Sequence, residues 1–214
     1  MESAITYVTK GGLIMAPIFV CSVVALAIII ERLIFFKKYF VGVDEFFNSI
    51  QKIVGDGNTK KIVDHCHNNP NPLGRIISAG LDEIEVPRWK LEEKLTFAGQ
   101  EEINALEKNM RGLEVIATIS PLLGLLGTVI GMVQAFNKVA QYKGQVDPSL
   151  LAGGIWEALL TTAAGLSVAI PTIIMLHYFE RKKERIAFQF SKYGNKFIYS
   201  MDKNFYPEFS SRIK

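Results

Sequence analysis

Charged residues are absent from three long stretches of this 214-residue chain. None occurs in 11–30 or in 115–137, and in 158–179 the only side chain that ionises near neutral pH is His177. Each stretch reaches the roughly 20 residues that a helix needs to cross about 30 Å of hydrocarbon. The absence of charge therefore argues against a soluble globular protein and predicts three transmembrane helices.

Cysteine and recognisable catalytic motifs are also scarce. Of the two cysteines, Cys21 lies in the first apolar stretch and Cys66 in a polar region, so no disulfide is expected. No nucleophile elbow, phosphate-binding loop or pair of catalytic carboxylates is present, so we predict no enzyme, no catalytic residues and no cofactor. The run Asp64-His65-Cys66-His67 has metal-ligand chemistry, but neighbours on a helix point about 100° apart and cannot converge on one ion. We predict no metal site.

A large excess of one charge sign is missing too, because the net charge is only +3. This small excess lies at the ends of the apolar stretches, so it indicates membrane topology and not nucleic-acid binding. One side carries Arg32, Lys37, Lys38, Lys108, Arg111, Arg181, Lys182, Lys183 and Arg185, whereas the other carries only Lys10, Lys138 and Lys143. The positive-inside rule then places the N-terminus outside and the C-terminus inside.

These observations predict an all-α integral membrane protein with three transmembrane helices, the second and third extended into the cytoplasm as long helices. The segments are an external 1–10, transmembrane helix 11–36, a cytoplasmic helical region 37–114, transmembrane helix 115–137, an external loop 138–154, transmembrane helix 155–179, and a cytoplasmic helix and tail 180–214. The first span is expected to remain as an anchor, because its apolar core is long for a cleaved signal peptide.

Two further features concern the cytoplasmic helices. Within 37–114, amphipathic helices are expected at 39–54 and 73–84, separated by a glycine turn near Gly55 and a proline breaker at Pro70 and Pro72. A charged helix from Arg88 to Met110 contains no breaker, so we expect it to run directly into the second span.

The second apolar stretch carries a stripe of small residues at helical spacing. Its members are Ser120, Gly124, Gly127, Thr128, Gly131 and Ala135. Small residues let a second backbone approach closely, which drives helix association in lipid. The stripe is therefore predicted to face protein or a pore.

The third stretch has a matching small and polar face, formed by Ala158, Thr161, Thr162, Gly165, Ala169 and Thr172, with Glu157 at its edge. Glu157 is either a functional group inside the assembly or a marker of where the span begins. Likewise, Thr128 and Thr162 either form a polar line across the membrane or bond back to their own helices. Apart from Glu157, neither stretch offers a carboxylate, so a proton carrier has to come from another chain.

The residues Pro121-Leu-Leu-Gly-Leu-Leu-Gly-Thr128-Val-Ile-Gly131-Met, followed by Gly154-Ile-Trp-Glu157-Ala-Leu-Leu-Thr-Thr162-Ala-Ala-Gly165-Leu and Ala169-Ile-Pro171, resemble the MotA/TolQ/ExbB proton-channel family, in its ExbB/TolQ branch. The resemblance implies a homopentamer in the bacterial inner membrane around ExbD- or TolR-like single-span helices that carry a membrane aspartate. It also implies a TonB- or TolA-like partner that is energised by H⁺ flow, contact with membrane lipids, and no nucleic acid.

The resemblance also implies roles for individual residues. Thr128, Thr162 and Glu157 would form the proton pathway, with Thr161 beside them. Helix packing and pore lining would fall to Ser120, Pro121, Gly124, Gly127, Gly131, Gly165 and Ala169. The alternatives are a passive scaffold for a partner helix and a membrane enzyme, although no cytoplasmic polar cluster supports the enzyme. The sequence leaves open whether the transported ion is H⁺ or Na⁺. It also leaves open whether the role is ExbB-like or TolQ-like.

Overall fold

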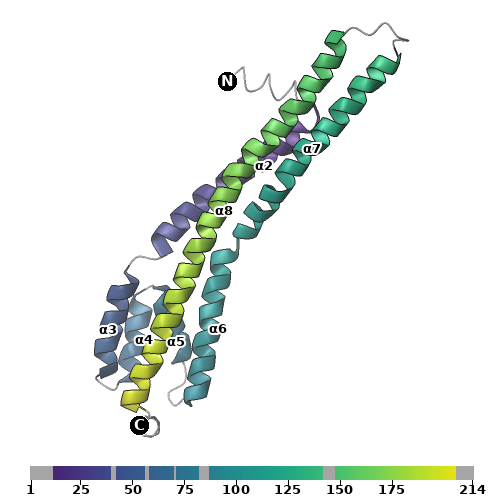
Figure 1. Cartoon of the computed structure of the whole chain (residues 1–214). Helices are drawn as coiled ribbons and strands as arrows, with labels where there is room; N and C mark the ends of the chain where they lie inside the picture. The colour runs from purple at the N-terminus through teal and green to yellow at the C-terminus, as the bar shows by residue number, and fades with distance from the viewer. Residues whose placement is uncertain are drawn as a thin grey trace. The chain divides into compact units, whose positions relative to one another are not determined.

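The computed structural model describes residues 12–39, 42–55, 58–69, 71–81, 87–141 and 148–205, and these residues form helices without any strand (Figure 1). The helices are α2 (Met15–Tyr39), α3 (Val43–Gly55), α4 (Thr59–Asn68), α5 (Pro72–Gly80), α6 (Arg88–Glu107), α7 (Met110–Gln141) and α8 (Pro148–Phe205). Three of them, α2, α7 and α8, include segments long and apolar enough to cross a membrane. The predicted all-α fold with three membrane-spanning helices is confirmed.

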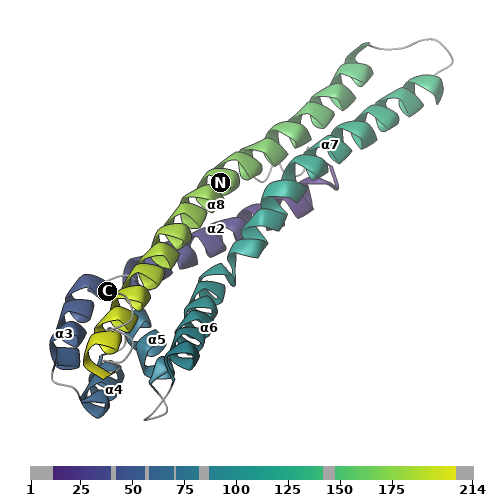
Figure 2. The same ribbon diagram turned by 60° about the horizontal axis from the view of Figure 1, so that its bottom comes forward.

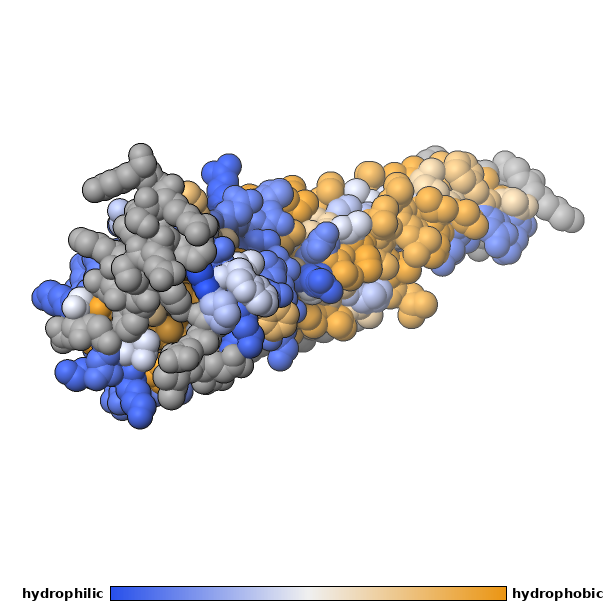
Figure 3. Space-filling view, turned by 90° about the horizontal axis from the view of Figure 1, so that it is seen from below, coloured by the Kyte–Doolittle hydropathy of each residue, from blue (hydrophilic) through white to orange (hydrophobic). Residues whose placement is uncertain are grey.

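The chain divides into two compact units. The membrane unit comprises Met1–Arg32 and Asn109–Phe179, and the polar unit comprises Leu33–Lys108 and Glu180–Lys214. Hydrophobic side chains gather on the visible surface of the membrane unit, whereas hydrophilic ones predominate among the coloured residues of the polar unit (Figure 3).

The membrane unit places large apolar side chains outside and small ones inside. Leu26, Leu122, Val129 and Ile174 are each more than half exposed. In contrast, the buried residues of α7 from position 120 onward are all small: Ser120, Gly124, Gly127, Gly131 and Ala135. Such an arrangement suits a lipid environment, where exposed apolar surface carries no penalty and close backbone packing holds helices together.

The polar unit has an ordinary hydrophobic core. Its fully buried side chains include Ile50 of α3, Ile62 of α4, Ile77 of α5, Leu91 of α6 and Phe197 of α8. The asparagine caps explain two of the helix starts. Asn58 accepts a hydrogen bond from the Lys61 N–H at 3.2 Å, and Asn71 accepts one from the Leu73 N–H at 3.0 Å.

The expected continuous helix from Arg88 into the second span is interrupted. Helix α6 ends at Glu107 and α7 begins at Met110, with a turn at Lys108 and Asn109. The Asn109 amide donates a hydrogen bond to the Glu31 carboxylate at 3.0 Å. Asparagine is a weak helix former because its short amide finds partners outside the helix, which accounts for the break. Helix α8, by contrast, continues without interruption from Pro148 to Phe205, as predicted for the third span.

Several predicted boundaries shift. The helices predicted at 39–54 and 73–84 are observed as α3 and α5, while α4, which begins after the Asn58 cap, was not predicted. Around the predicted external loop 138–154, α7 extends to Gln141 and α8 begins at Pro148. The predicted external segment 1–10 lies outside the described residues.

Candidate functional site

Helices α7 and α8 lie side by side in the membrane unit (Figures 1 and 2), and glycine sets how closely they approach. A Cβ atom added to Gly165 would lie 2.5 Å from the Ser120 carbonyl oxygen. One added to Gly124 would lie 3.0 Å from Cα of Thr162. The first distance is an overlap and the second is an unusually tight contact, so glycine lets these two backbones approach this closely.

Farther along the same contact, small side chains of one helix pack onto glycines of the other. Ala158 of α8 packs against Gly131 of α7. A Cβ atom added to Gly131 would lie 2.9 Å from the Ala158 methyl group. Thr161 packs against Gly127 so closely that any added side chain would overlap its hydroxyl. The structure thus places the small-residue stripe against α8 of the same chain.

The three threonines singled out in the sequence have different partners. The Thr162 hydroxyl donates across the helix contact to the Gly124 carbonyl at 2.9 Å. The Thr161 hydroxyl is buried, and it lies 2.7 Å from the Ala158 carbonyl of its own helix and 3.4 Å from the Gly124 carbonyl of α7. Thr128 also bonds to its own helix, at the Leu125 carbonyl at 2.6 Å. Thr162 therefore makes the shorter hydrogen bond between the two helices, and Thr161 makes a longer one to the same carbonyl.

Thr128 lies at the edge of the stripe, partly exposed at the surface of the membrane unit. It borders an open depression of α7 whose other lining residues are Val129, Met132, Val133 and Phe136. Its hydroxyl proton is engaged, but a hydroxyl oxygen retains lone pairs that can accept a hydrogen bond. Thr128 is thus a member of the predicted pathway that an approaching chain can reach.

Glu157 is half-buried and lies inside α8, because the helix begins at Pro148. Its carboxylate lies against Gly12, where an added Cβ would be 2.5 Å from Oε1. Gly12 has φ +70°, a backbone conformation that glycine adopts without strain. The backbone before α2 can therefore approach Glu157 for two reasons: glycine has no side chain that would overlap the carboxylate, and it adopts the positive φ without strain.

The remaining predicted packing residues differ in burial. Ser120 and Ala169 are buried, and Pro121 is half-buried within α7. The Ser120 hydroxyl oxygen has no hydrogen-bond partner among the described residues. Pro121 lacks an N–H group, so it cannot donate to the Ala117 carbonyl as other helical residues would.

Sequence reasoning missed a polar cluster in the polar unit. The Arg75 guanidinium binds the Glu102 carboxylate with both arms, at 2.5 and 2.7 Å, and the Tyr39 hydroxyl donates to the same carboxylate. Burial raises the pKa of Glu102, but the hydrogen bonds from Arg75 and Tyr39 outweigh burial and lower it below its usual value. Burial and the neighbouring carboxylate raise the pKa of Tyr39.

This cluster joins the end of α2 to the consecutive helices α5 and α6, through residues that are 27 to 63 positions apart in the sequence. Because no local spacing connects the three residues, nothing in the sequence pattern could have identified the cluster. The one feature that stands out locally is that Arg75 is the single charged residue of α5.

The Asp64-His65-Cys66-His67 run lies on α4, and its side chains point in different directions. Asp64 and His67 are exposed, whereas burial raises the pKa of Cys66 to about 12. His65 stacks on Phe46 with the ring centroids 5.6 Å apart, and its Nε2 lies 2.8 Å from the Ser49 hydroxyl oxygen. Ser49 donates to the Phe46 carbonyl, so His65 is the donor to Ser49. Among the described residues, no three of these ligand types come together as a metal site.

The region that contains the α7 and α8 contact is similar to known proteins. Residues 68–192 match the model of the MotA/TolQ/ExbB proton channel family. The chain is 32% identical over 177 residues to the biopolymer transport protein exbB1 of Vibrio cholerae, covering 81% of this chain and 77% of that protein. It is 31% identical over 170 residues to the putative biopolymer transport protein ExbB-like 3 of Synechocystis, covering 79% and 81%. Over 101 residues it is 37% identical to the Tol-Pal system protein TolQ of Haemophilus influenzae, covering 47% and 42%.

Proposed function

Because this chain belongs to the MotA/TolQ/ExbB proton channel family, we propose that it is a motor subunit that uses proton flow to energise TonB- or TolA-dependent envelope transport. The printed names of its relatives, which refer to biopolymer transport and to the Tol-Pal system, support this direction. In this proposal the chain is not an enzyme and carries no cofactor, and H⁺ is the ion that it transports.

The proposed assembly is a homopentamer in the bacterial inner membrane, with the N-terminus in the periplasm and the C-terminus in the cytoplasm. It surrounds ExbD- or TolR-like helices that supply a membrane aspartate. One observation carries this proposal. Within 115–137 and 158–179, α7 and α8 contain no carboxylate, although Thr128 is accessible from outside the chain. A proton carrier next to Thr128 therefore has to be brought by a partner.

The energetics permit the coupling. One charge that crosses a membrane potential of 100 mV releases about 2.3 kcal/mol. A single hydrogen bond contributes about 1 kcal/mol to stability, so the crossing can drive the exchange of one or two such bonds. The Thr128 hydroxyl would accept a hydrogen bond from the protonated partner aspartate and release it when the proton leaves. Glu157 would attract cations at one end of the path.

The test is proton flux into liposomes that contain this chain and its single-span partner, measured with an internal pH dye over a series of imposed voltages. We expect flux that requires the partner aspartate and falls at least tenfold in Thr128→Val, while native mass spectrometry still detects the complex. Flux in Thr128→Val equal to that of the wild type would refute the assigned pathway.

Two further arms separate the alternatives. Replacing the proton gradient with a sodium gradient identifies the transported ion. Ion flux that responds only to sodium would exclude a proton channel. An assembled complex that carries no voltage-driven flux at all would identify a passive scaffold.

A further inference from the structure

Helices α6 and α8 of the polar unit expose four aromatic side chains to solvent. Trp89 and Phe97 of α6 are 66% and 67% exposed, and Phe188 and Tyr199 of α8 are 70% and 75% exposed. Large aromatic side chains contribute strongly to protein interfaces, because they bury a large area while losing little conformational freedom. Four of them on two neighbouring helices indicate a contact surface.

The charges on the two exposed faces are of opposite sign. The exposed charged residues beside the α6 aromatics are Glu93 and Glu101, while Lys90 and Lys94 on the same side are half-buried. The α8 face carries four exposed basic residues, Arg181, Arg185, Lys192 and Lys196, and one acidic residue, Glu184. The two faces are therefore complementary to each other.

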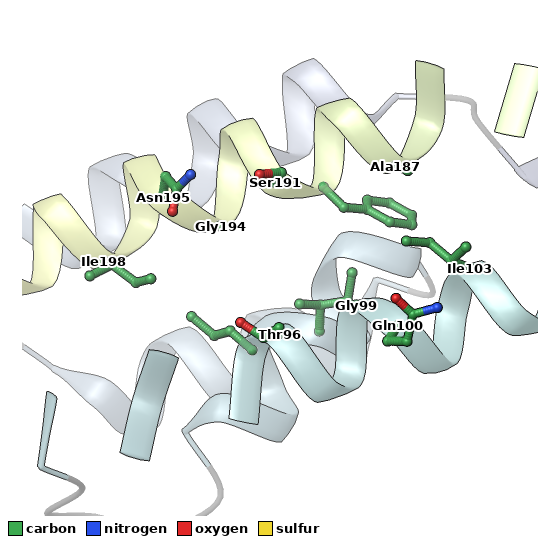
Figure 4. A pocket seen from close by; sticks show the side chains of 12 residues that line it. Thr96, Gly99, Gln100, Ile103, Ala187, Ser191, Gly194, Asn195 and Ile198 are labelled. Carbon is green, nitrogen blue, oxygen red and sulfur yellow. The ribbon is translucent and has the colours of Figure 1, made fainter. Parts of the chain in front are cut away.

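The two faces cannot meet within one chain. A groove of about 200 Å³ separates α6 from α8, and Thr96 and Gln100 line it from one side while Ser191 and Asn195 line it from the other (Figure 4). Each of these four residues immediately precedes a residue of a charged face, namely Phe97, Glu101, Lys192 and Lys196. Successive helical residues are rotated by about 100°, so both faces turn out of the groove toward solvent.

Two ion pairs set the alignment of the antiparallel helices. Arg88 lies 3.0 Å from Asp202, and Glu107 lies 2.8 Å from Lys183. The spacing from 88 to 107 on α6 equals that from 202 to 183 on α8, so the alignment is the same at both ends. Counting inward from these pairs places Glu93 opposite position 197 and Phe97 opposite position 193. Glu93 is therefore level with Lys196 to within one residue, and Phe97 is level with Lys192 to within one residue.

The same count brings Trp89 to within two residues of the level of Tyr199. In a membrane, the copies of a cyclic assembly are related by rotation about the membrane normal, so equivalent residues lie at equal heights. In the proposed contact α6 and α8 run along that axis, so residues that are level within one chain are also level between neighbouring chains. One contact would then contain three pairs: the aromatic pair Trp89 and Tyr199, the ion pair Glu93 and Lys196, and the cation–π pair Phe97 and Lys192.

We propose that the α6 face of one copy docks against the α8 face of the next copy, with Trp89 on Tyr199, Glu93 on Lys196 and Phe97 on Lys192. The contact joins two different surfaces, so its repetition closes a ring and does not stop at a dimer. Exposed ion pairs stabilise little, so the oligomer of the proposed function holds the copies together and the charges set the orientation of this contact. This inference rests on the homo-oligomer of the proposed function.

Site-directed cross-linking tests the contact in the full-length chain, in membranes and with its partner present. In a background with Cys21→Ala and Cys66→Ala, the pair Trp89→Cys and Tyr199→Cys is treated with a short bismaleimide. We expect a ladder of products beyond the dimer, because every chain then carries both halves of the contact. Chains with only one of these cysteines should give at least tenfold less product, and a mixture of the two single variants should stop at dimers.

A matched control uses the same two faces at different levels. The pair Trp89→Cys and Phe188→Cys should give little ladder, because Phe188 lies three helical turns from the level of Trp89. Equal cross-linking of both pairs would indicate random collision and overturn the proposal. Dimers formed by a single-cysteine chain would show that the contact is symmetric. An absent ladder would show that the two faces do not meet. Each result overturns the proposal.

Charge exchange provides an independent measurement on the cross-linking pair. Glu93→Lys with Glu101→Lys should lower the ladder severalfold, as should Lys192→Glu with Lys196→Glu, and the combination of all four should restore it. If reversal on α8 instead releases the single-span partner and leaves the ladder intact, that face binds the partner and the proposal fails. Proton flux is measured on the same samples. Flux without a ladder contradicts only the contact, whereas a ladder without flux contradicts only the proposed function.

Discussion

At the scale of single residues, Thr162 and Thr128 differ in what their hydroxyls hold. Thr162 bonds across to the Gly124 carbonyl, whereas Thr128 bonds to Leu125 of its own helix. We therefore expect Thr162→Val to lower the free energy of unfolding by about 1 kcal/mol and to reduce proton flux. Thr128→Val should reduce flux and leave stability within about 0.5 kcal/mol, because only a local bond is lost.

Thermal unfolding in detergent and flux in liposomes check both variants. Equal stability of the two would mean that the bond from Thr162 to Gly124 does not hold the helices together. Wild-type flux in both would remove the threonines from the pathway.

Glu157 tests whether charge is needed where the carboxylate lies against Gly12. Glu157→Gln keeps the shape and most hydrogen bonding but removes the charge, so we expect flux to fall several-fold while the oligomer persists. A flux–voltage series in liposomes measures the effect, with Gln134→Glu as a comparison that adds a carboxylate on an exposed position of α7. A silent Glu157→Gln would mean that the residue only marks the beginning of the apolar span.

At the scale of elements, glycine determines the spacing between α7 and α8. Gly127→Leu would drive a side chain into Thr161, and overpacking of this kind costs about 1–3 kcal/mol or more. We expect lower stability and loss of the assembled oligomer by native mass spectrometry. Gly153→Leu is the matched control, because a Cβ at Gly153 on α8 meets no atom within 4 Å. Similar behaviour of the two variants would contradict close packing at Gly127.

The Tyr39, Arg75 and Glu102 cluster joins three elements of the polar unit and gives a pH dependence of known sign. The folded-state pKa of Glu102 lies below its ordinary value of 4.5, so its stabilising effect is fully present above that value. As the pH falls through the lowered pKa, the carboxylate is protonated and the stabilisation is lost. Because Arg75 is half exposed, we expect an effect of about 1 kcal/mol at most.

Urea unfolding between pH 3 and pH 7 measures this effect on the polar unit within the intact chain. Glu102→Gln should flatten the acid limb of the stability curve, while Glu45→Gln, at an exposed position of α3, should not. An unchanged acid limb in Glu102→Gln would exclude Glu102 as its source.

At the scale of the whole molecule, α8 is the one helix that contributes a long run of residues to both units. Its residues up to Phe179 belong to the membrane unit and those from Glu180 to the polar unit, while α6 and α7 are separated by the turn at Lys108 and Asn109. A continuous helix transmits displacement along its axis, whereas a turn absorbs it. Helix α8 is therefore the element expected to couple proton flow to the polar unit.

Arg181→Pro tests this coupling. Proline removes the helical hydrogen bond to the His177 carbonyl and costs about 3 kcal/mol locally, so α8 would break beside the unit boundary. We expect proton flux to persist while partner-dependent transport in cells falls strongly. Arg181→Ala controls for the lost charge. Transport at the wild-type level in Arg181→Pro, with the break verified by circular dichroism, would show that α8 does not couple the units.

Several properties follow from the sequence by itself, because they depend on local periodicity and composition. The three uncharged stretches predicted the membrane helices, and the spacing of Gly124, Gly127 and Gly131 predicted a face for close contact. The absence of a breaker after Phe179 predicted the continuous α8. Each of these features is encoded within one segment of chain.

The tertiary structure decided which segments meet. The glycine stripe could have faced a pore, a second copy or another helix, and packing against Thr161 and Thr162 selects α8 of the same chain. Arg75 and Glu102 pair only because the polar unit brings α5 beside α6. The turn at Asn109 depends on Glu31, which is distant in sequence. A helical period specifies which side of a helix is small, apolar or charged, but only folding brings a partner to that side.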